Sequence, residues 1–542
     1  MTPQTPRVTL AVGVFTLLLG LAACDRTPDT PAAPASSPQP AAAESVLRRG
    51  NFGDPGSLDP QLAIDTGAYD ILRDLYEGLL SEAPDGTLSP GVSTSWTVSP
   101  DGRVYRFALR PEARWSDGSP VLAEHFVTAM RHAVDPASAS PAADLLRAIT
   151  GARQILSGDR HPETLGVRAV DPLTLEIVLE EPTPYFLSLL THAVFYPRHP
   201  AAGTDGTPTH TISNGPYRFR QWVPNLHIEV DRNPHYWDRD NVRIGRVLYY
   251  PIASEGNEYL RYRAGDLDIT NSLPLANLPD IRRERPSELR IGPYLGTYFL
   301  ALNLRRSPFA GNPDLRRALS LAIDREALAR QVLRDSQIPA WGLVPPGTAN
   351  YDPQRDAAYA LPQSERLAKA RELYASATAG LSKPLKLRVI YGNSDSVRST
   401  LIAIASMWRE AFGLELDVYT EEFRVYLETQ KDPDQWQVLR YAWVADYNDA
   451  FSFLELFRSD SPTNVFGYRE PRFDALLASS QRIQDPLQRA SVLQEAEALL
   501  VADAAFIPLF HMQSRRLVSP RVTGFVPTPL NRIYSKHLAV SD

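Results

Sequence analysis

The chain has 542 residues, of which 43% are hydrophobic, and a formal net charge of -7 at pH 7. This length is sufficient for a large hydrophobic core and predicts about three or four domain-sized units of roughly 150 residues each. The near balance of charge offers no basic surface for nucleic acid, and the single cysteine excludes an internal disulfide and a metal site with paired cysteine ligands.

The first 23 residues are typical of a signal peptide for export. Arg7 is the only charge before an apolar run, residues 8–23, which is shorter than the about 20 apolar residues that span a bilayer. The run ends in Leu-Ala-Ala-Cys, which is similar to the bacterial lipobox and predicts cleavage before Cys24 and acylation of its thiol. The alternative is a plain cleavable signal followed by a chance cysteine.

Residues 24–43 are predicted to form the lipid anchor and an extended tether, because proline and alanine dominate the stretch and it cannot build a core. Asp25 is similar to the signal that keeps lipoproteins on the inner membrane of bacteria with two membranes. We therefore expect a periplasmic protein held by a lipid to the outer face of the inner membrane, with no other membrane contact.

From residue 44 onward the patterns predict a mixed α/β protein. Apolar and polar residues alternate in three segments that we expect to be half-buried strands, residues 102–110, 174–179 and 226–230. A strand, a helix and a strand follow one another in residues 385–391, 395–412 and 414–418, an order that predicts parallel pairing. Asn312 and Asp485 each precede a proline at a predicted helix start, as an N-cap residue does.

The stretch from Arg440 to Asn448 is apolar or aromatic along most of its length, which predicts a buried strand with a cation at one end and an anion near the other. Side chains six residues apart on a strand point to the same face, so Arg440 and Asp446 would face one ligand across about 20 Å at full extension. A short peptide is also an extended chain with opposite charges at its ends. The alternative is a core strand whose two charges form ion pairs elsewhere.

Motifs of common enzyme classes are absent from the sequence. There is no His-Glu-x-x-His zinc motif, Gly-x-Ser-x-Gly elbow, Walker phosphate loop or Ser-x-x-Lys, and the ten histidines are scattered. We therefore predict no catalytic residue, metal or cofactor, although a Ser-His-Asp set assembled in space leaves no sequence motif.

Between about residues 45 and 540 the sequence resembles the bacterial periplasmic oligopeptide-binding proteins, the peptide/nickel-type solute receptors of ABC importers. The matching motifs lie in order along the chain at residues 57–60 (SLDP), 73–80 (RDLYEGLL), 115–118 (WSDG), 214–217 (NGPY), 232–237 (RNPHYW), 322–325 (AIDR) and 445–448 (ADYN). The resemblance implies a two-lobed periplasmic-binding-protein fold of three α/β domains with mixed sheets, in which the lobes close about a hinge onto the ligand.

The same resemblance implies domain boundaries. Residues 44–76, 201–296 and 513–542 would form the first domain of one lobe, and residues 77–200 would be a second domain inserted in that lobe. Residues 297–512 would form the other lobe.

In the family the peptide is held as an added strand between segments of the two lobes. The matching backbone positions are Ile64, Asp65 and Thr66 on one lobe and Ala442, Trp443 and Val444 on the other. Asp446 matches the acid that binds the ligand's α-ammonium, and Arg440 matches a cation that receives its carboxylate. Their structural alternatives are a local cap for Asp446 and an ion pair for Arg440.

Further site residues follow from the resemblance. Arg398 stands where relatives carry a histidine that serves longer peptides, with an exposed helix position as its alternative. Phe423, Trp443 and Tyr447 are candidate walls for ligand side chains, or core residues.

The sequence also departs from the family's pattern at the ligand's two ends. Gln430 and Leu333 replace an arginine and a lysine near the carboxylate, and Ala142 replaces a tyrosine on the N-terminal side. Gly296 and Val444 stand where relatives have a disulfide pair.

We therefore expect a monomeric substrate-binding lipoprotein that delivers short peptides to an inner-membrane ABC permease. A receptor of the same fold for cell-wall peptides, nickel chelates or haem is the alternative. From other classes, an envelope hydrolase or a protein-binding envelope scaffold stays open at this point.

Overall fold

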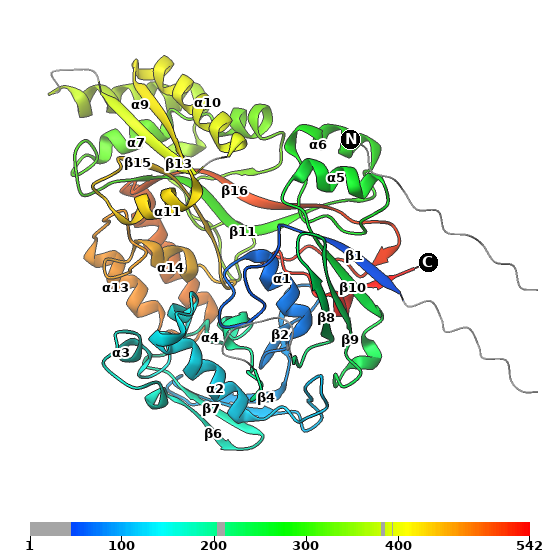
Figure 1. Ribbon diagram of the computed structural model, residues 1–542. Coiled ribbons are helices and arrows are strands. Elements are labelled where there is room, and N and C mark those ends of the chain that lie inside the picture. The colour runs from blue at the N-terminus through cyan, green and yellow to red at the C-terminus, as the bar shows by residue number, and fades with distance from the viewer. Residues whose placement is uncertain (1–44, 203–211, 381–384, 393, 542) are drawn as a thin grey trace, which may run out of the picture. The chain divides into compact units, whose positions relative to one another are not determined.

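Figure 1 shows the computed structural model, which describes residues 45–202, 212–380, 385–392 and 394–541. These residues belong to one compact unit. None of the helices within them has the length and apolar character needed to cross a membrane. The predicted signal peptide (residues 1–23), the lipidation site Cys24 and the tether up to residue 43 lie outside the described residues, so these assignments stay predictions.

Two four-stranded sheets lie in the N-terminal half of the chain. In the first, β1 (Val46–Asn51) pairs in parallel with β10 (Arg246–Pro251), and β9 (His227–Arg232) and β8 (Tyr217–Val223) follow antiparallel. The second is antiparallel, in the order β4 (Ser93–Val98), β5 (Val104–Leu109), β7 (Thr174–Val178) and β6 (Val167–Asp171). The chain therefore leaves the first sheet after β1, builds the second, and returns at β8.

The second sheet is formed by strands with one buried face. Alternation along β5 turns Tyr105, Phe107 and Leu109 inward and leaves the residues between them more exposed. The helix α2 (Ala123–Val134) packs on β6 and β7 and buries Phe126 and Met130 in the same core.

A six-stranded mixed sheet dominates the C-terminal half. Its order is β12 (Ile338–Pro339), β16 (Phe506–Leu517), β11 (Leu289–Leu302), β15 (Val438–Val444), β13 (Lys386–Gly392) and β14 (Glu415–Glu421). Phe299 and Ala301 of β11 lie in the core on one face, and Leu300 and Leu302 lie in the core on the other. Because both faces are covered here, residues 298–302 of β11 form a continuous apolar run rather than an alternating one.

Helices and short strands complete the fold. The helices are α1 (Thr66–Leu75), α3 (Ala152–Leu156), α4 (Phe186–Leu189), α5 (Glu255–Arg263), α6 (Leu278–Glu284), α7 (Pro313–Leu321), α8 (Arg325–Ala327), α9 (Gln363–Thr378), α10 (Asp395–Phe412), α11 (Phe423–Lys431), α12 (Phe451–Leu454), α13 (Pro471–Ser480) and α14 (Pro486–Ala502). Two hairpin-like pairs, β2 (Leu80–Glu82) with β3 (Leu88–Pro90) and β17 (Val522–Thr523) with β18 (Ala539–Val540), lie outside the larger sheets.

Most elements predicted from local patterns are confirmed. The strands β5, β7 and β9 and the unit β13–α10–β14 form at the expected places, and β13 and β14 pair in parallel. Asn312 and Asp485 cap α7 and α14 by accepting hydrogen bonds from the amides of Leu315 and Gln488.

The strand predicted over residues 440–448 is wrong in its extent, because β15 ends at Val444. Ala445 still donates to the Leu295 carbonyl at 2.8 Å, but bends replace the strand from there on. The six-residue spacing therefore does not place Arg440 and Asp446 on one strand face.

The two longest strands, β11 and β16, run side by side (Figure 1). Residues 289–293 of β11 pair with residues 513–517 of β16, beside Thr270, whose amide donates to the Leu517 carbonyl. The pairing is interrupted between Pro293 and Thr297 and then resumes within the six-stranded sheet. The predicted domain boundaries at 296/297 and 512/513 fall inside these two strands, beside that interruption.

Candidate functional site

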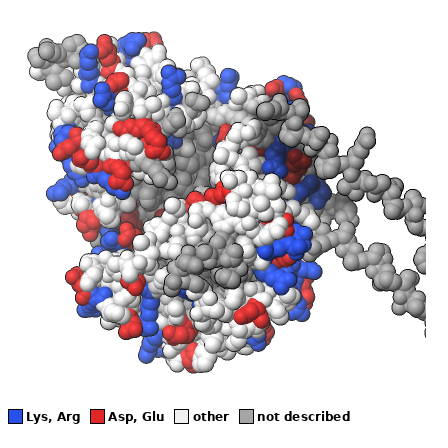
Figure 2. All heavy atoms as spheres, in the orientation of Figure 1, with Lys and Arg blue, Asp and Glu red and all other residues white. Residues whose placement is uncertain are grey.

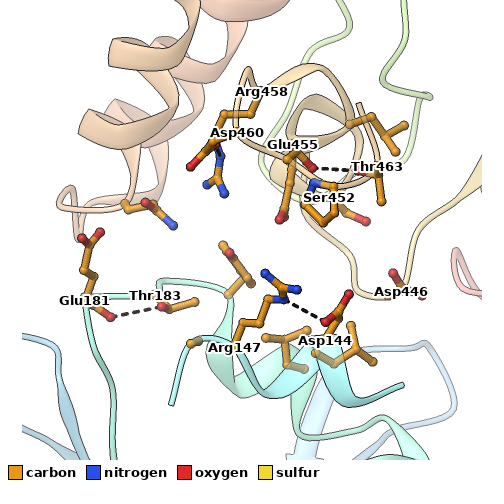
Figure 3. Close-up of a pocket in the computed structure, with 18 of the residues that line it drawn as sticks. Asp144, Arg147, Glu181, Thr183, Asp446, Ser452, Glu455, Arg458, Asp460 and Thr463 are labelled. Carbon is orange, nitrogen blue, oxygen red and sulfur yellow. Dashed lines mark hydrogen bonds and ion pairs between the residues drawn. The ribbon is translucent and has the colours of Figure 1, made fainter. Parts of the chain in front are cut away.

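A cavity of about 700 Å³ lies between residues 144–189 and residues 443–481. Figure 3 shows side chains from both segments facing it, among them Arg147 and Glu181 from the first and Asp446 and Glu455 from the second. Three of the predicted site residues line it, namely Trp443, Asp446 and Tyr447. Two segments far apart in the sequence therefore meet at this cavity.

The strand β15 has an open edge just before this cavity. Its partner β11 pairs with it along Val438–Val444, whereas β13 pairs only with Val438 and Leu439. In an antiparallel pair, every second residue directs its N–H and C=O toward the partner strand. Ala445 donates to β11, so Ala442 and Val444, at odd spacings from it, direct their backbone groups away from β11. The Tyr426 hydroxyl, which donates to the Arg440 carbonyl, marks the same outward side. Ala442 and Val444 thus present an edge for an additional strand.

The segment predicted to pair with the other side of a ligand lies before α1. Ile64 is 69% exposed, and among the described residues nothing forms a backbone hydrogen bond with it. Asp65 is the N-cap of α1, and its carboxylate accepts from the amides of Ala68 at 2.7 Å and Gly56 at 3.1 Å. Thr66 is the exposed first residue of the helix. The side chain of Asp65 is therefore engaged within the protein, and this residue has only its backbone groups left for a ligand.

Asp446 is the strongest candidate for the ligand's ammonium. Its backbone carbonyl accepts from Arg532 Nη2 at 2.7 Å, but within the described part of the chain no hydrogen bond or ion pair reaches its carboxylate. Burial raises the pKa of this carboxyl to about 6, and the nearby Arg532 guanidinium opposes the shift. A half-buried carboxylate without a counter-ion is a ready site for a cation, and the predicted local cap is not formed.

Arg440 has no acidic partner either. Its guanidinium lies over the ring of Tyr298, 4.0 Å from the ring centroid, and burial lowers its pKa. In the residues that the structure describes it forms no ion pair, so the alternative of a structural ion pair is not supported. It does not line the cavity that holds Asp446.

Two other predicted residues lie elsewhere. Arg398 is exposed on α10 and does not line this cavity. Phe423 is the first residue of α11, and its side chain lies outside the described part.

Leu333 and the pair Gly296 and Val444, which depart from the family pattern, have clear structural surroundings. Leu333 is buried in the core and is only 4% exposed, so it replaces a cation with an apolar core residue. Gly296 lies opposite Val444 in the register of β11 and β15. Cysteines at these two positions, as in the relatives, would face each other across the two strands. A side chain at Gly296 would clash with Met512.

The cavity wall combines stacked rings with buried polar atoms. Tyr447 stacks on Tyr185 with 4.5 Å between ring centroids and 9° between ring planes. The indole Nε1 of Trp443 and the hydroxyl of Ser452 are buried and have no hydrogen-bond partner among the described residues. Sequence reasoning missed Tyr185, Ser452 and Arg532, since no motif marks them.

Charge is evenly spread over the visible surface. On the face that Figure 2 shows, acidic and basic side chains of the described residues are interspersed, without a broad basic area.

Comparison with known proteins settles the family. The model of the bacterial extracellular solute-binding proteins, family 5 (middle), matches residues 87–464. The periplasmic oligopeptide-binding protein OppA of Salmonella typhimurium is 35% identical over 549 residues, which cover 100% of this chain and 99% of that protein. The chain belongs to the family 5 solute-binding proteins.

Other members are similar along most of the chain. The murein peptide-binding protein MppA of Escherichia coli is 34% identical over 90% of this chain and 91% of its own. The structure of Haemophilus influenzae OppA in complex with RPPGFSPFR superposes with a TM-score of 0.79 at 31% identity, covering 92% of this chain and 100% of that chain.

Family membership confirms three predictions made from the sequence. The fold is the mixed α/β fold of periplasmic solute-binding proteins, and the family and its homologues are substrate-binding proteins of ABC transporters. The chain is therefore a binding protein and not an enzyme, which removes the hydrolase alternative.

Proposed function

We propose that this chain is the substrate-binding lipoprotein of an ABC peptide importer, and that it binds short peptides by adding them as a strand to β15. The observation that carries the proposal is the open edge at Ala442 and Val444, followed at once by the unpaired carboxylate of Asp446. Backbone pairing is common to all peptides, so it gives affinity without choosing a sequence.

The ligand's α-ammonium supplies the counter-ion that Asp446 lacks. An α-amino group has a pKa of about 7.7–8.0 and is largely charged at neutral pH. A charge-assisted hydrogen bond in a site with little water is stronger than one at the surface. The free amine is thus the part of the ligand that the site recognises most strongly.

The carboxylate end depends on Arg440. Its guanidinium is shielded from water and forms no ion pair with an acid among the described residues. A planar guanidinium can bind a carboxylate with two parallel hydrogen bonds. Gln430 is neutral and Leu333 lies in the core. The predicted cation at this end is therefore Arg440, which is half-buried and forms no ion pair with an acid among the described residues.

Closure of two lobes brings Ile64 to the opposite side of the ligand. The two strands β11 and β16, with their interruption near Pro293, supply a flexible connection between the predicted domains. The loaded monomer, held by lipid on Cys24 at the periplasmic face of the inner membrane, delivers its peptide to a permease. Relatives named as periplasmic binding proteins support this location.

Cell-wall peptides are the second candidate ligand. The similarity to a murein peptide-binding protein favours them, as does the loss of two cations near the carboxylate end, because such peptides carry carboxylates at unusual places. Native mass spectrometry of the purified protein separates the two candidates by the masses that accompany it.

Free-amine tripeptides should stabilise the protein, and N-acetylated ones should not. At about 100 times Kd a ligand adds about 2.7 kcal/mol of stability, which corresponds to a rise in Tm of roughly 5 °C. The acetylated tripeptide at the same concentration should raise Tm by less than about 1 °C, because it carries no ammonium for Asp446. Scanning fluorimetry measures both, and equal shifts would contradict the proposal.

Replacing Val444 with proline should weaken peptide binding about five- to tenfold. The amide of Val444 faces away from β11, so proline removes a donor from the open edge without breaking the pairing of β11 and β15. One hydrogen bond contributes about 1 kcal/mol. Val444→Ala keeps the amide and is the control in a calorimetric titration; equal affinity of the two variants would exclude strand addition at this edge.

A further inference from the structure

A second carboxylate without a counter-ion lies in the same cavity as Asp446. Glu455 follows α12 on the wall formed by residues 443–481, and among the described residues its carboxylate has neither a hydrogen bond nor an ion pair. Burial raises its pKa, the Arg458 guanidinium opposes this shift, and the charge of Asp446 adds to it, so the two carboxylates lie near enough to repel each other. Figure 3 shows both of them facing the cavity.

A neutral polar group near Glu455 is also left without a partner among the described residues. Ser452 lies one helical turn before Glu455 and is only 4% exposed, yet its hydroxyl has no hydrogen-bond partner within the described residues. Native proteins rarely bury polar groups without partners, so this wall is built for a polar group that comes from a ligand.

The charges around the cavity favour a cation. Seven aspartates and glutamates and three arginines line it. Two of the arginines are engaged locally, Arg147 with Asp144 at 2.8 Å and Arg458 with Asp460 at 2.5 Å. Arg458 also lowers the pKa of Glu455, and the third arginine, Arg153, which is exposed on α3, lowers it less, so Arg458 is the main protein group that competes for this carboxylate.

We propose that this cavity binds a second positive charge of the ligand, carried by the side chain of its first residue. The α-ammonium would pair with Asp446, and the side-chain ammonium or guanidinium of a first-position lysine or arginine would pair with Glu455 beside the Ser452 hydroxyl. A lysine suits this geometry because its flexible four-carbon stem carries a compact charge past Asp446. The inference rests on the proposed function, and it adds a preference for peptides that begin with a basic residue.

Isothermal titration calorimetry with two tripeptides tests the inference. Lys-Ala-Ala and norleucine-Ala-Ala have first side chains with the same four-carbon stem, but only lysine carries the second charge. The wild-type protein should bind Lys-Ala-Ala at least about tenfold more tightly. Glu455→Gln should reduce this ratio to about twofold or less, chiefly by weakening the lysine peptide.

Glu181→Gln is the matched control. It removes the same charge from an exposed glutamate at the rim of the cavity and should keep the tenfold ratio. If it loses the ratio as fully as Glu455→Gln does, the preference comes from the general negative potential and the assignment of Glu455 is overturned.

Other outcomes distinguish a failure of the preference for a basic first residue from a failure of peptide binding itself. If the wild-type protein binds both tripeptides equally, the preference for a basic first residue is overturned while peptide binding stands. If Glu455→Gln and Arg458→Gln each weaken both peptides equally, Glu455 serves an internal charge pair with Arg458 and the inference is again overturned. If neither peptide binds, the proposed function itself fails.

Discussion

Replacing Asp446 with asparagine is expected to weaken binding of free-amine tripeptides by about 100-fold and to abolish their advantage over N-acetylated ones. Removing one partner of a buried charge pair costs about 2–5 kcal/mol, and every 1.4 kcal/mol is about a factor of ten in Kd. The acetylated peptide should lose little, because it has no ammonium to lose. Calorimetric titration of both peptides measures the effect, and a variant that still prefers the free amine would refute the role of Asp446.

The pH dependence of binding follows from the same group. Because the carboxyl of Asp446 has a pKa of about 6 in the empty protein, a proton must leave it before an ammonium can pair with it. Affinity should therefore fall about tenfold for each pH unit below about 6. It should also fall above about pH 8, where the ligand's amine loses its charge. Asp446→Asn should flatten the acid limb and leave the alkaline limb, which belongs to the ligand.

Stability of the ligand-free variant shows whether the substitution has damaged the fold. The pKa of Asp446 is about 6 in the folded protein against an ordinary 3.8, so the folded state favours the neutral carboxyl. The charged carboxylate therefore lowers the free energy of unfolding. This loss of stability is absent below about pH 4, grows between about pH 4 and pH 6, and is complete above about pH 6. Asp446→Asn should therefore raise Tm by a few degrees at pH 7.5 and leave it nearly unchanged at pH 4. A lower Tm at pH 7.5 would mean that the carboxylate has a partner within the protein.

The elements that the sequence predicted well are those whose signals are local. The ends of α10 follow from its periodic apolar residues, and the start of α14 follows from the aspartate and proline at 485 and 486. The end of β15 was not predictable in this way, because Trp443, Val444 and Ala445 continue the apolar pattern of a strand. The pairing ends because the chain bends toward the cavity, and no residue in that stretch predicts the bend.

The same distinction between local signals and distant contacts applies to the candidate site. Asp446 was found from a motif, but its surroundings come from segments hundreds of residues away. Arg532 bonds with Glu82, 450 residues earlier in the chain, and Tyr185 stacks on Tyr447. Such contacts are decided by how three predicted domains meet, and a single sequence carries no signal for that. The side chain of Asp65 caps α1, whereas its predicted role in ligand binding concerns only its backbone and stays a prediction.

Arg532, in the first predicted domain, contacts residues of the other two predicted domains. Its Nη1 contacts Glu82 Oε1 at 2.6 Å and Thr191 Oγ1 at 2.7 Å, both in the predicted inserted domain, and its Nη2 donates to the Asp446 carbonyl at 2.7 Å. The side chains of Arg532 and Glu82 are 9% and 4% exposed. This buried ion pair fixes the guanidinium that bonds to the Asp446 backbone, next to the proposed ammonium site, and Arg532 also lowers the pKa of Asp446.

Replacing Arg532 with methionine should lower Tm by roughly 10 °C and weaken peptide binding as well. Methionine keeps most of the apolar stem but leaves the buried Glu82 carboxylate without its counter-ion, which costs about 3–5 kcal/mol. The loss of the guanidinium frees the Asp446 carbonyl and lets the pKa of its carboxyl rise. The acid limb of the binding profile should therefore move to a pH above 6. Scanning fluorimetry and calorimetry at several pH values measure the two effects.

The double variant Arg532→Met with Glu82→Gln separates these roles. It removes the uncompensated buried charge, so it should recover at least half of the lost Tm. It cannot restore the hydrogen bond to the Asp446 carbonyl, so weak binding and the shifted acid limb should persist. If affinity returned together with Tm, Arg532 would act only on the stability of the fold. Persistent weak binding in a stable protein would show that this guanidinium positions the carboxylate that receives the ligand.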